Sequence, residues 1–221
     1  MISLTFIQKI FAYGVPILFA ITLHEVAHGW VANQLGDPTA RILGRLSINP
    51  LKHIDLIGTI LVPLMLFLTT GFVFGWAKSV PINWRNLRSK RRDIALVALA
   101  GPLSNLIMAL IWGLIIQLSM RLYLMNPIDL AIGMIVMGKI GIEINLVLLA
   151  LNLIPIPPLD GSRVVASFLP FALAKFYARI EPFGFVILLL LLNFRVLGIV
   201  VDPIVGTLQN WIGGMFRLGM I

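Results

Sequence analysis

Three long apolar stretches constrain the fold of this chain more than any other feature. Residues 6 to 31, 94 to 118 and 133 to 153 each have the length of about 20 residues that a helix needs to cross the hydrocarbon core of a bilayer. With 59% hydrophobic residues and a mean hydropathy of +1.00, the chain carries more apolar surface than a soluble core of this size needs. We therefore expect an all-α polytopic membrane protein, a bundle of about four to six transmembrane helices.

Two further apolar stretches are interrupted. Residues 56 to 74 have Pro63 at their middle and glycine and threonine near both ends, which favours a re-entrant segment that leaves and returns on one side of the membrane. Residues 183 to 201 either span or turn back, and the pattern after Pro203 predicts one more packed or interfacial helix. No repeat or domain boundary is visible, so we expect residues 1 to 221 to form a single membrane-embedded domain.

The basic residues lie between the apolar stretches, which is typical of topology signals, and no nucleic-acid binding is expected despite a net charge of +8. If residues 56 to 74 turn back, twelve of the 17 Lys and Arg residues share one side: 41, 45, 52, 78, 85, 88, 90, 91, 92, 163, 175 and 179. That side is then predicted to be cytoplasmic. The absence of cysteine leaves His, Asp, Glu and Asn to hold any metal.

The sequence His24-Glu25-Val26-Ala27-His28 lies toward the end of the first apolar stretch. On a helix with about 3.6 residues per turn, His24 and His28 share one face and Glu25 projects beside them. This spacing lets two imidazoles hold a zinc ion next to a general base. An ionisable group inside lipid costs about 2.5 to 3.5 kcal/mol and is rarely left there without a use. The motif therefore predicts a metal site rather than two core histidines.

A third ligand must come from elsewhere, because a hydrolytic zinc site uses three protein ligands and one open position. Asp160 is the best candidate, since it follows a proline-rich segment, residues 152 to 159, that cannot be helical. Such backbone is tolerated inside a membrane only beside protein or a water-filled cavity. On spacing alone, Asp160 could equally be the N-cap of a helix over residues 162 to 169. We expect His53 to be solvated or interfacial rather than a ligand.

The second long apolar stretch carries Ala100-Gly101-Pro102-Leu103, where a kink and close packing against another helix are expected. Asn105, one turn further, could face the histidine helix. Taken in order, the histidine motif, this motif and residues 152 to 161 resemble the site-2 protease family of intramembrane zinc metalloproteases. The resemblance covers the catalytic core, about residues 14 to 165, in a minimal form without a PDZ or nucleotide-sensing domain.

The resemblance implies a function and a role for each matching residue. His24, His28 and Asp160 would hold one Zn²⁺ per chain, Glu25 would activate the attacking water, and Asn152 would help to hold substrate or the oxyanion. The expected activity is hydrolysis of peptide bonds within or near the transmembrane segments of single-span membrane proteins. The expected partners are such a protein or peptide and the lipid bilayer, in a prokaryotic plasma membrane, and the oligomeric state is not predicted.

A rough alternation from Trp76 to Ile82 predicts a short edge strand that could receive an unwound substrate by β-augmentation. Trp76, Lys78 and Val80 are the contact residues expected from that pattern. The alternative function is a non-catalytic zinc-binding membrane protein or a zinc carrier. Glu25 discriminates between the two, because a carrier needs the metal ligands but only a hydrolase needs the glutamate.

Overall fold

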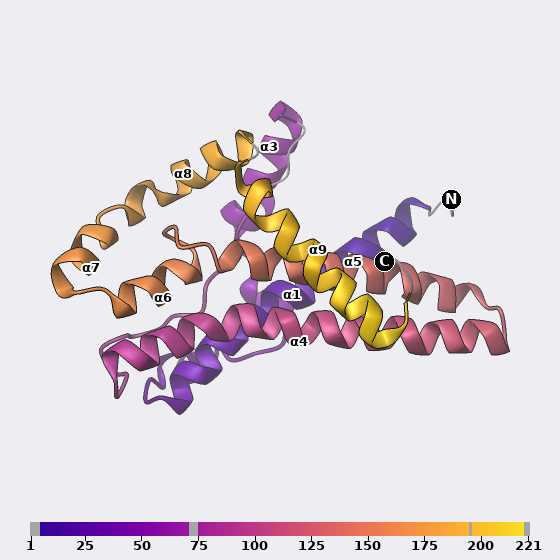
Figure 1. Cartoon of the computed structure of the whole chain (residues 1–221), viewed down its shortest axis with the longest axis horizontal. Coiled ribbons are helices and arrows are strands. Elements are labelled where there is room, and N and C mark those ends of the chain that lie inside the picture. The colour runs from indigo at the N-terminus through magenta and orange to yellow at the C-terminus, as the bar shows by residue number, and fades with distance from the viewer. Residues whose placement is uncertain (1–4, 71–74, 195, 219–221) are drawn as a thin grey trace.

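The structure, a computed structural model, describes residues 5–70, 75–194 and 196–218, and these residues are organised into helices (Figure 1). The elements are α1 (Phe6–Gln34), α2 (Thr39–Ile42), the 3-10 turn η1 (Pro50–His53), the π-helical turn η2 (Leu56–Leu61), α3 (Val62–Thr70), α4 (Lys90–Met125), α5 (Asp129–Asn152), α6 (Asp160–Phe168), α7 (Phe171–Ala178), α8 (Glu181–Asn193) and α9 (Val196–Phe216).

Within the described residues, four helices are long and apolar enough to cross a membrane, namely α1, α4, α5 and α9. This confirms an all-α polytopic membrane protein. Two boundaries differ from the expectation. Helix α4 continues to Met125, so the polar connection to α5 is shorter than residues 119 to 132. The apolar run of residues 183 to 201 is divided between α8 and α9, because α8 ends at Asn193.

Helices α1, α4 and α5 form the centre of the bundle. The short connection makes α4 and α5 an antiparallel pair, and α1 packs against both (Figure 1). Small residues allow this close approach: a Cβ on Gly138 of α5 would lie 2.4 Å from Ile116 of α4, and one on Gly141 would lie 2.5 Å from the Trp112 ring. Small residues are the usual means of close helix contact in membranes, where hydrophobic burial adds little.

Helix α9 crosses the α4–α5 pair and completes the apolar core (Figure 1). The buried side chains at this crossing come from all three helices and include Trp112, Ile142 and Ile212. Helices α6, α7 and α8 follow α5 and form an arch to one side of it (Figure 1). The three central helices are thereby fixed relative to one another, and they are the elements that position the metal centre.

The two ends of the predicted re-entrant segment meet. The Trp76 N–H donates to the Gly58 carbonyl at 3.0 Å, and the Thr59 hydroxyl donates to the Trp76 carbonyl at 2.9 Å. Between these contacts, η2 and α3 together rise about 22 Å at 1.5 Å per residue. The chain therefore leaves and returns at one place, as expected of a segment that does not cross. Residues 71–74 lie outside the described residues.

The predicted edge strand is wrong: within the part of the chain that the structure describes, residues 75–83 are extended but belong to no strand. A strand requires a ladder with a neighbouring strand. Here the N–H groups of Trp76 and Lys78 donate instead to isolated carbonyls, those of Gly58 and His53. The segment is held as an extended strap by turns and side chains rather than by a sheet.

Candidate metal centre

Three side chains from two distant parts of the sequence meet beside α4. His24 and His28 lie on one face of α1, and Asp160 is the first residue of α6. The two Nε2 atoms are 3.1 Å apart, and Asp160 Oδ2 lies 3.1 Å from His24 Nε2 and 3.3 Å from His28 Nε2. Among the described residues, His24, His28 and Asp160 form the cluster of His, Asp and Glu side chains whose ligand atoms lie close enough to share a metal ion.

The separations fit a tetrahedral cation site. Ligand atoms about 2.0 to 2.1 Å from a tetrahedral zinc ion lie about 3.3 Å from one another, close to the distances found here. Both Nδ1 atoms face acceptors, Asn105 Oδ1 at 2.6 Å and the Val97 carbonyl at 2.7 Å. Each neutral imidazole therefore carries its proton on Nδ1 and directs the lone pair of Nε2 into the cluster.

Asp160 Oδ2 completes the set of lone pairs. It is buried, and no hydrogen-bond donor contacts it among the described residues. Buried lone pairs that converge without a donor repel one another and lose their hydration. A cation relieves both penalties, so the donor set of two imidazoles and one carboxylate fits Zn²⁺.

Gly101 makes room for the histidines on the side of α4. A Cβ at this position would lie 2.3 Å from His28 Nε2 and 2.6 Å from both Nε2 and Cε1 of His24. Only glycine is therefore compatible with imidazoles in this place. Pro102 follows within the helix and is buried. The predicted supporting residues Gly101, Pro102 and Asn105 thus lie where α4 passes the cluster.

The loop before α6 carries Asp160 to the histidines. α5 ends at Asn152, and the chain turns back on itself, so that a Cβ on Gly161 would lie 2.3 Å from the Leu153 carbonyl oxygen. α6 begins at Asp160 and its N-cap residue, Leu159, makes no side-chain cap. The Asp160 carboxylate faces the histidines, which removes the alternative of a helix-capping role.

Glu25 faces the extended strap. Its Oε2 accepts a hydrogen bond from the Val80 N–H at 2.8 Å. Glu25 follows His24 on the helix and lines the same cavity as the cluster. The strap and the predicted general base are therefore in direct contact.

Asp37 anchors the far end of the strap to α1. This buried carboxylate accepts from the backbone N–H of Thr39 at 3.2 Å, the Asn83 N–H at 2.7 Å and the Asn86 side-chain amide at 2.9 Å. Burial raises the pKa of Asp37, but these hydrogen bonds outweigh it and hold the pKa below its ordinary value. The carboxylate is thus a charged clamp that fixes residues 83 to 86 next to the end of α1.

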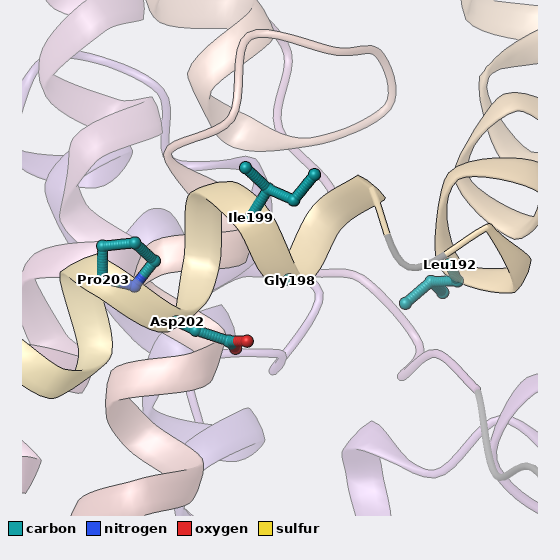
Figure 2. Close-up of a pocket in the computed structure, with 5 residues that line it drawn as sticks. All are labelled: Leu192, Gly198, Ile199, Asp202 and Pro203. Atoms are coloured by element: carbon teal, nitrogen blue, oxygen red, sulfur yellow. The ribbon is translucent and has the colours of Figure 1, made fainter.

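A cavity of about 630 Å³ opens over the cluster. Its walls are mostly apolar, and the polar groups are concentrated at Glu25, the three candidate ligands, Asn152 and Arg163. Of the predicted substrate contacts, Asn152, Trp76 and Val80 line the cavity, whereas Lys78 does not. Figure 2 shows a second hollow at the α8–α9 junction, where Asp202 is the charged residue among the five that line it. It shares no lining residue with the metal centre.

His53 is buried rather than solvated: it is 2% exposed, and its Nε2 lies 2.9 Å from the Ser47 carbonyl oxygen. Among the described residues it does not belong to the group that is close enough to share a metal ion. The burial reflects the packing of η1 under the strap. Asn145 of α5 is fully buried and donates its amide to Gly141 while accepting from Asn105. A polar residue in the middle of an apolar span was the signal that could have identified it.

Comparisons with known proteins give relatives but no structural template. No protein-family model matches the chain, and no solved structure matches it. A Bacillus subtilis (strain 168) protein named "Putative zinc metalloprotease YwhC" is 39% identical over 178 residues, which cover 80% of this chain and 78% of the relative. A Mycolicibacterium smegmatis protein named "Putative zinc metalloprotease Rip2" is 29% identical over 178 residues, covering 79% of this chain and 64% of the relative. Rip2 of Mycobacterium tuberculosis (strain H37Rv) is 29% identical over 174 residues.

These names agree with the geometry. They indicate a zinc metalloprotease with Zn²⁺ as its cofactor, and the chain brings together two histidines and a carboxylate at distances that suit this ion. In the part of the chain that the structure describes, four helices are long and apolar enough to cross a membrane, as in an integral membrane protein. With a relative at 39% identity over most of both sequences, the chain belongs to the site-2 protease family.

Proposed function

We propose that this chain is an intramembrane zinc endopeptidase that hydrolyses peptide bonds within or near the transmembrane segments of single-span membrane proteins. The observation that carries the proposal is the depth of the cluster within the spans. His24 lies about 15 Å along α1 from its end at Gln34, and Gly101 lies about 16 Å along α4 from its start at Lys90, at 1.5 Å per residue. Both distances support a position of the cluster below the surface of a hydrocarbon core about 30 Å thick.

The side chains around the cluster suit peptide hydrolysis. His24, His28 and Asp160 would hold Zn²⁺, which would supply a Lewis acid for polarising a carbonyl and acidifying water. Glu25 is the base that takes the proton from the attacking water, and the Val80 N–H holds its carboxylate in place through one oxygen. Asn152 donates one amide hydrogen to the Leu148 carbonyl at 3.0 Å, which leaves its second N–H for the substrate oxyanion.

Among the described residues, the strap offers two backbone N–H groups on its cavity side to an unwound substrate, whereas the Ser79 carbonyl accepts from Arg45 Nη2 at 3.4 Å. In extended backbone, alternate residues point their N–H and C=O groups to opposite sides. The N–H groups of Trp76, Lys78 and Val80 are bonded to Gly58, His53 and Glu25. No hydrogen bond from the N–H groups of Ala77 and Ser79 is recorded among the described residues, and both residues line the cavity. Substrate main chain would therefore pair with Ala77 and Ser79 rather than with Lys78.

The basic residues orient the protein. Because hydrogen bonds join Gly58 and Trp76, the nine basic residues from Arg41 to Arg92 would all lie on one side of the membrane. The bias toward that side supports a cytoplasmic position for the active site, in the plasma membrane of a prokaryote. A substrate would then be cut toward its cytoplasmic end.

The test uses purified protein in vesicles with a set of single-span reporter proteins. The wild type is expected to cleave with zinc and to stop when a chelator removes it. Glu25→Gln should keep one zinc per chain, because the three ligands are intact and the Gln carbonyl still accepts from Val80, yet lose cleavage by about 10²-fold or more.

Glu143→Gln serves as the matched control, since Glu143 is an exposed glutamate of α5 outside the cavity lining. Its cleavage rate should equal that of the wild type. Wild-type cleavage by Glu25→Gln would exclude Glu25 as the base. Products cut only in the soluble flanks, as mapped by mass spectrometry, would exclude an intramembrane peptidase, and zinc uptake without any cleavage would favour a carrier.

A further inference from the structure

A hydrogen-bonded chain of two asparagines joins three spans and ends on a candidate zinc ligand. It begins at the Gly141 carbonyl of α5, which accepts from Asn145 Nδ2 at 2.8 Å. Asn145 Oδ1 accepts from Asn105 Nδ2 of α4 at 3.0 Å, and Asn105 Oδ1 faces His24 Nδ1 of α1 at 2.6 Å. Asn105 and Asn145 are both 0% exposed.

The Gly141 carbonyl determines which group donates and which accepts in each of these hydrogen bonds. A backbone carbonyl can only accept, so the Asn145 amide must turn its NH₂ toward Gly141 and its oxygen toward Asn105. Asn105 then has to present its NH₂ to that oxygen, and the Ala20 carbonyl at 3.3 Å accepts its second hydrogen. The Asn105 oxygen is left to face His24, and it requires a proton on Nδ1.

We propose that Asn105 and Asn145 form a positioning relay that fixes the tautomer and the ring orientation of His24 for metal binding. The inference rests on the metal centre of the proposed function but not on its catalytic step. With the proton held on Nδ1, the Nε2 lone pair is directed toward Asp160 and His28. Asn145 acts through Asn105, because it touches neither histidine and sets only the direction of the Asn105 amide.

The two histidines are held in different ways. His28 Nδ1 donates to the Val97 carbonyl at 2.7 Å, an acceptor that no side-chain substitution removes. His24 depends on an amide that could point either way if nothing fixed it. A reversed Asn105 amide would place NH₂ against Nδ1, move the imidazole proton to Nε2 and block the lone pair that the metal needs. Only His24 therefore depends on a side-chain acceptor, and a substitution of Asn105 can remove that acceptor.

The experiment measures the dissociation constant for Zn²⁺ by chelator competition on the full chain in detergent. Partners of metal-bound histidines are typically worth 10- to 100-fold in metal affinity, so Asn105→Leu should weaken zinc binding by about that factor and Asn145→Leu by about tenfold. Asn105→Asp keeps an acceptor for Nδ1–H but turns its second oxygen toward Asn145 Oδ1 and the Ala20 carbonyl, so it should recover only part of the affinity that Asn105→Leu loses. Ser119→Ala is the control, because the hydroxyl of this buried α4 residue donates to the Ile115 carbonyl of its own helix and, in the described ranges, to no other element.

A double substitution separates the relay from simple packing. The Asp carboxylate presents an acceptor oxygen to Nδ1 in either orientation, so it needs no partner to direct it. Asn145→Leu also removes the oxygen that opposes the second Asp oxygen, so it should leave zinc affinity unchanged or raise it in the Asn105→Asp background. Equal losses in both backgrounds would mean that Asn145 is only a packing residue and would overturn the relay.

A spectroscopic readout does not depend on cleavage. The chain has three histidines, so ¹⁵N-histidine labelling of the zinc-saturated protein gives few imidazole signals. The His24 Nδ1–H signal should be protected from solvent exchange in the wild type and in Asn105→Asp, and lost or strongly shifted in Asn105→Leu. An unchanged His24 signal together with unchanged zinc affinity in Asn105→Leu would contradict the proposal, even if cleavage were fully retained or fully absent.

Discussion

Gly101→Ala should prevent zinc binding without altering any ligand. The added methyl group would lie 2.3 Å from His28 Nε2 and 2.6 Å from His24 Nε2, whereas ordinary contact begins at 3.4 Å. The imidazoles or α4 must therefore move by about 1 Å. Zinc–nitrogen bonds tolerate about 0.2 Å, so a shift of this size separates the ligands beyond a common bonding distance.

The alternative response is a displacement of α4 from α1. Overpacking of this kind costs about 1 to 3 kcal/mol. Such a displacement also moves Asn105 away from His24, because both Gly101 and Asn105 face the histidine helix. Whichever element moves, the zinc dissociation constant should rise by about 100-fold or more, the equivalent of roughly 2.7 kcal/mol at the metal.

The assay is chelator competition for zinc, together with thermal unfolding with and without the metal. Gly14→Ala is the matched control on α1, because nothing lies within 4 Å of its Cβ position, and it should bind zinc normally with unchanged or slightly raised stability. Zinc binding by Gly101→Ala at wild-type affinity would refute the reasoning, since it would show that the imidazoles do not occupy the space beside Gly101.

Three further predictions concern the strap and the topology. Asp37→Asn should lower the free energy of unfolding by about 2 to 3 kcal/mol at neutral pH, because hydrogen bonds to a charged group are lost. Folding lowers the Asp37 pKa, so this stabilisation is complete above the ordinary pKa near 3.9 and is lost as the pH falls through the lower pKa of the folded state. The thermal unfolding curves of the variant and the wild type should therefore converge in acid. Ser79→Pro should reduce cleavage of single-span substrates more than Ser79→Ala does, because proline removes a free N–H at the cavity, and equal effects would exclude main-chain pairing there. Cysteines placed singly at Lys52 and Arg88 should label from the same side of sealed, oriented vesicles with an impermeant thiol reagent, and labelling from opposite sides would mean that residues 56 to 74 cross.

The sequence predicted the parts of this protein that depend on spacing within one helix or on runs of apolar residues. The stacking of His24 and His28 follows from a separation of four residues, and the long spans follow from composition. Asp160 was expected from the need for a third ligand and from the proline-rich segment before it, which cannot be helical. Such rules need no knowledge of which side chains touch.

Contacts between different elements were beyond this reasoning. The expectation of an edge strand failed because the N–H groups of the strap bond to Glu25 and to carbonyls of η1 and η2, and alternation alone does not show which partner a backbone group will find. Asn145 was overlooked for a similar reason. The role of Asn145 depends on its hydrogen bond with Asn105, 40 positions away in the sequence, and no short sequence motif indicates such a pair.

The meeting of Gly58 with Trp76 has a consequence for length variation. Because hydrogen bonds join the two ends, the 17 residues between them form a closed loop. Doubling the length of a flexible loop costs only about 0.6 kcal/mol of closure entropy. A relative with a longer segment between these two ends could therefore close the same hydrogen bonds and keep Trp76, and with it the wall of the cavity, in place.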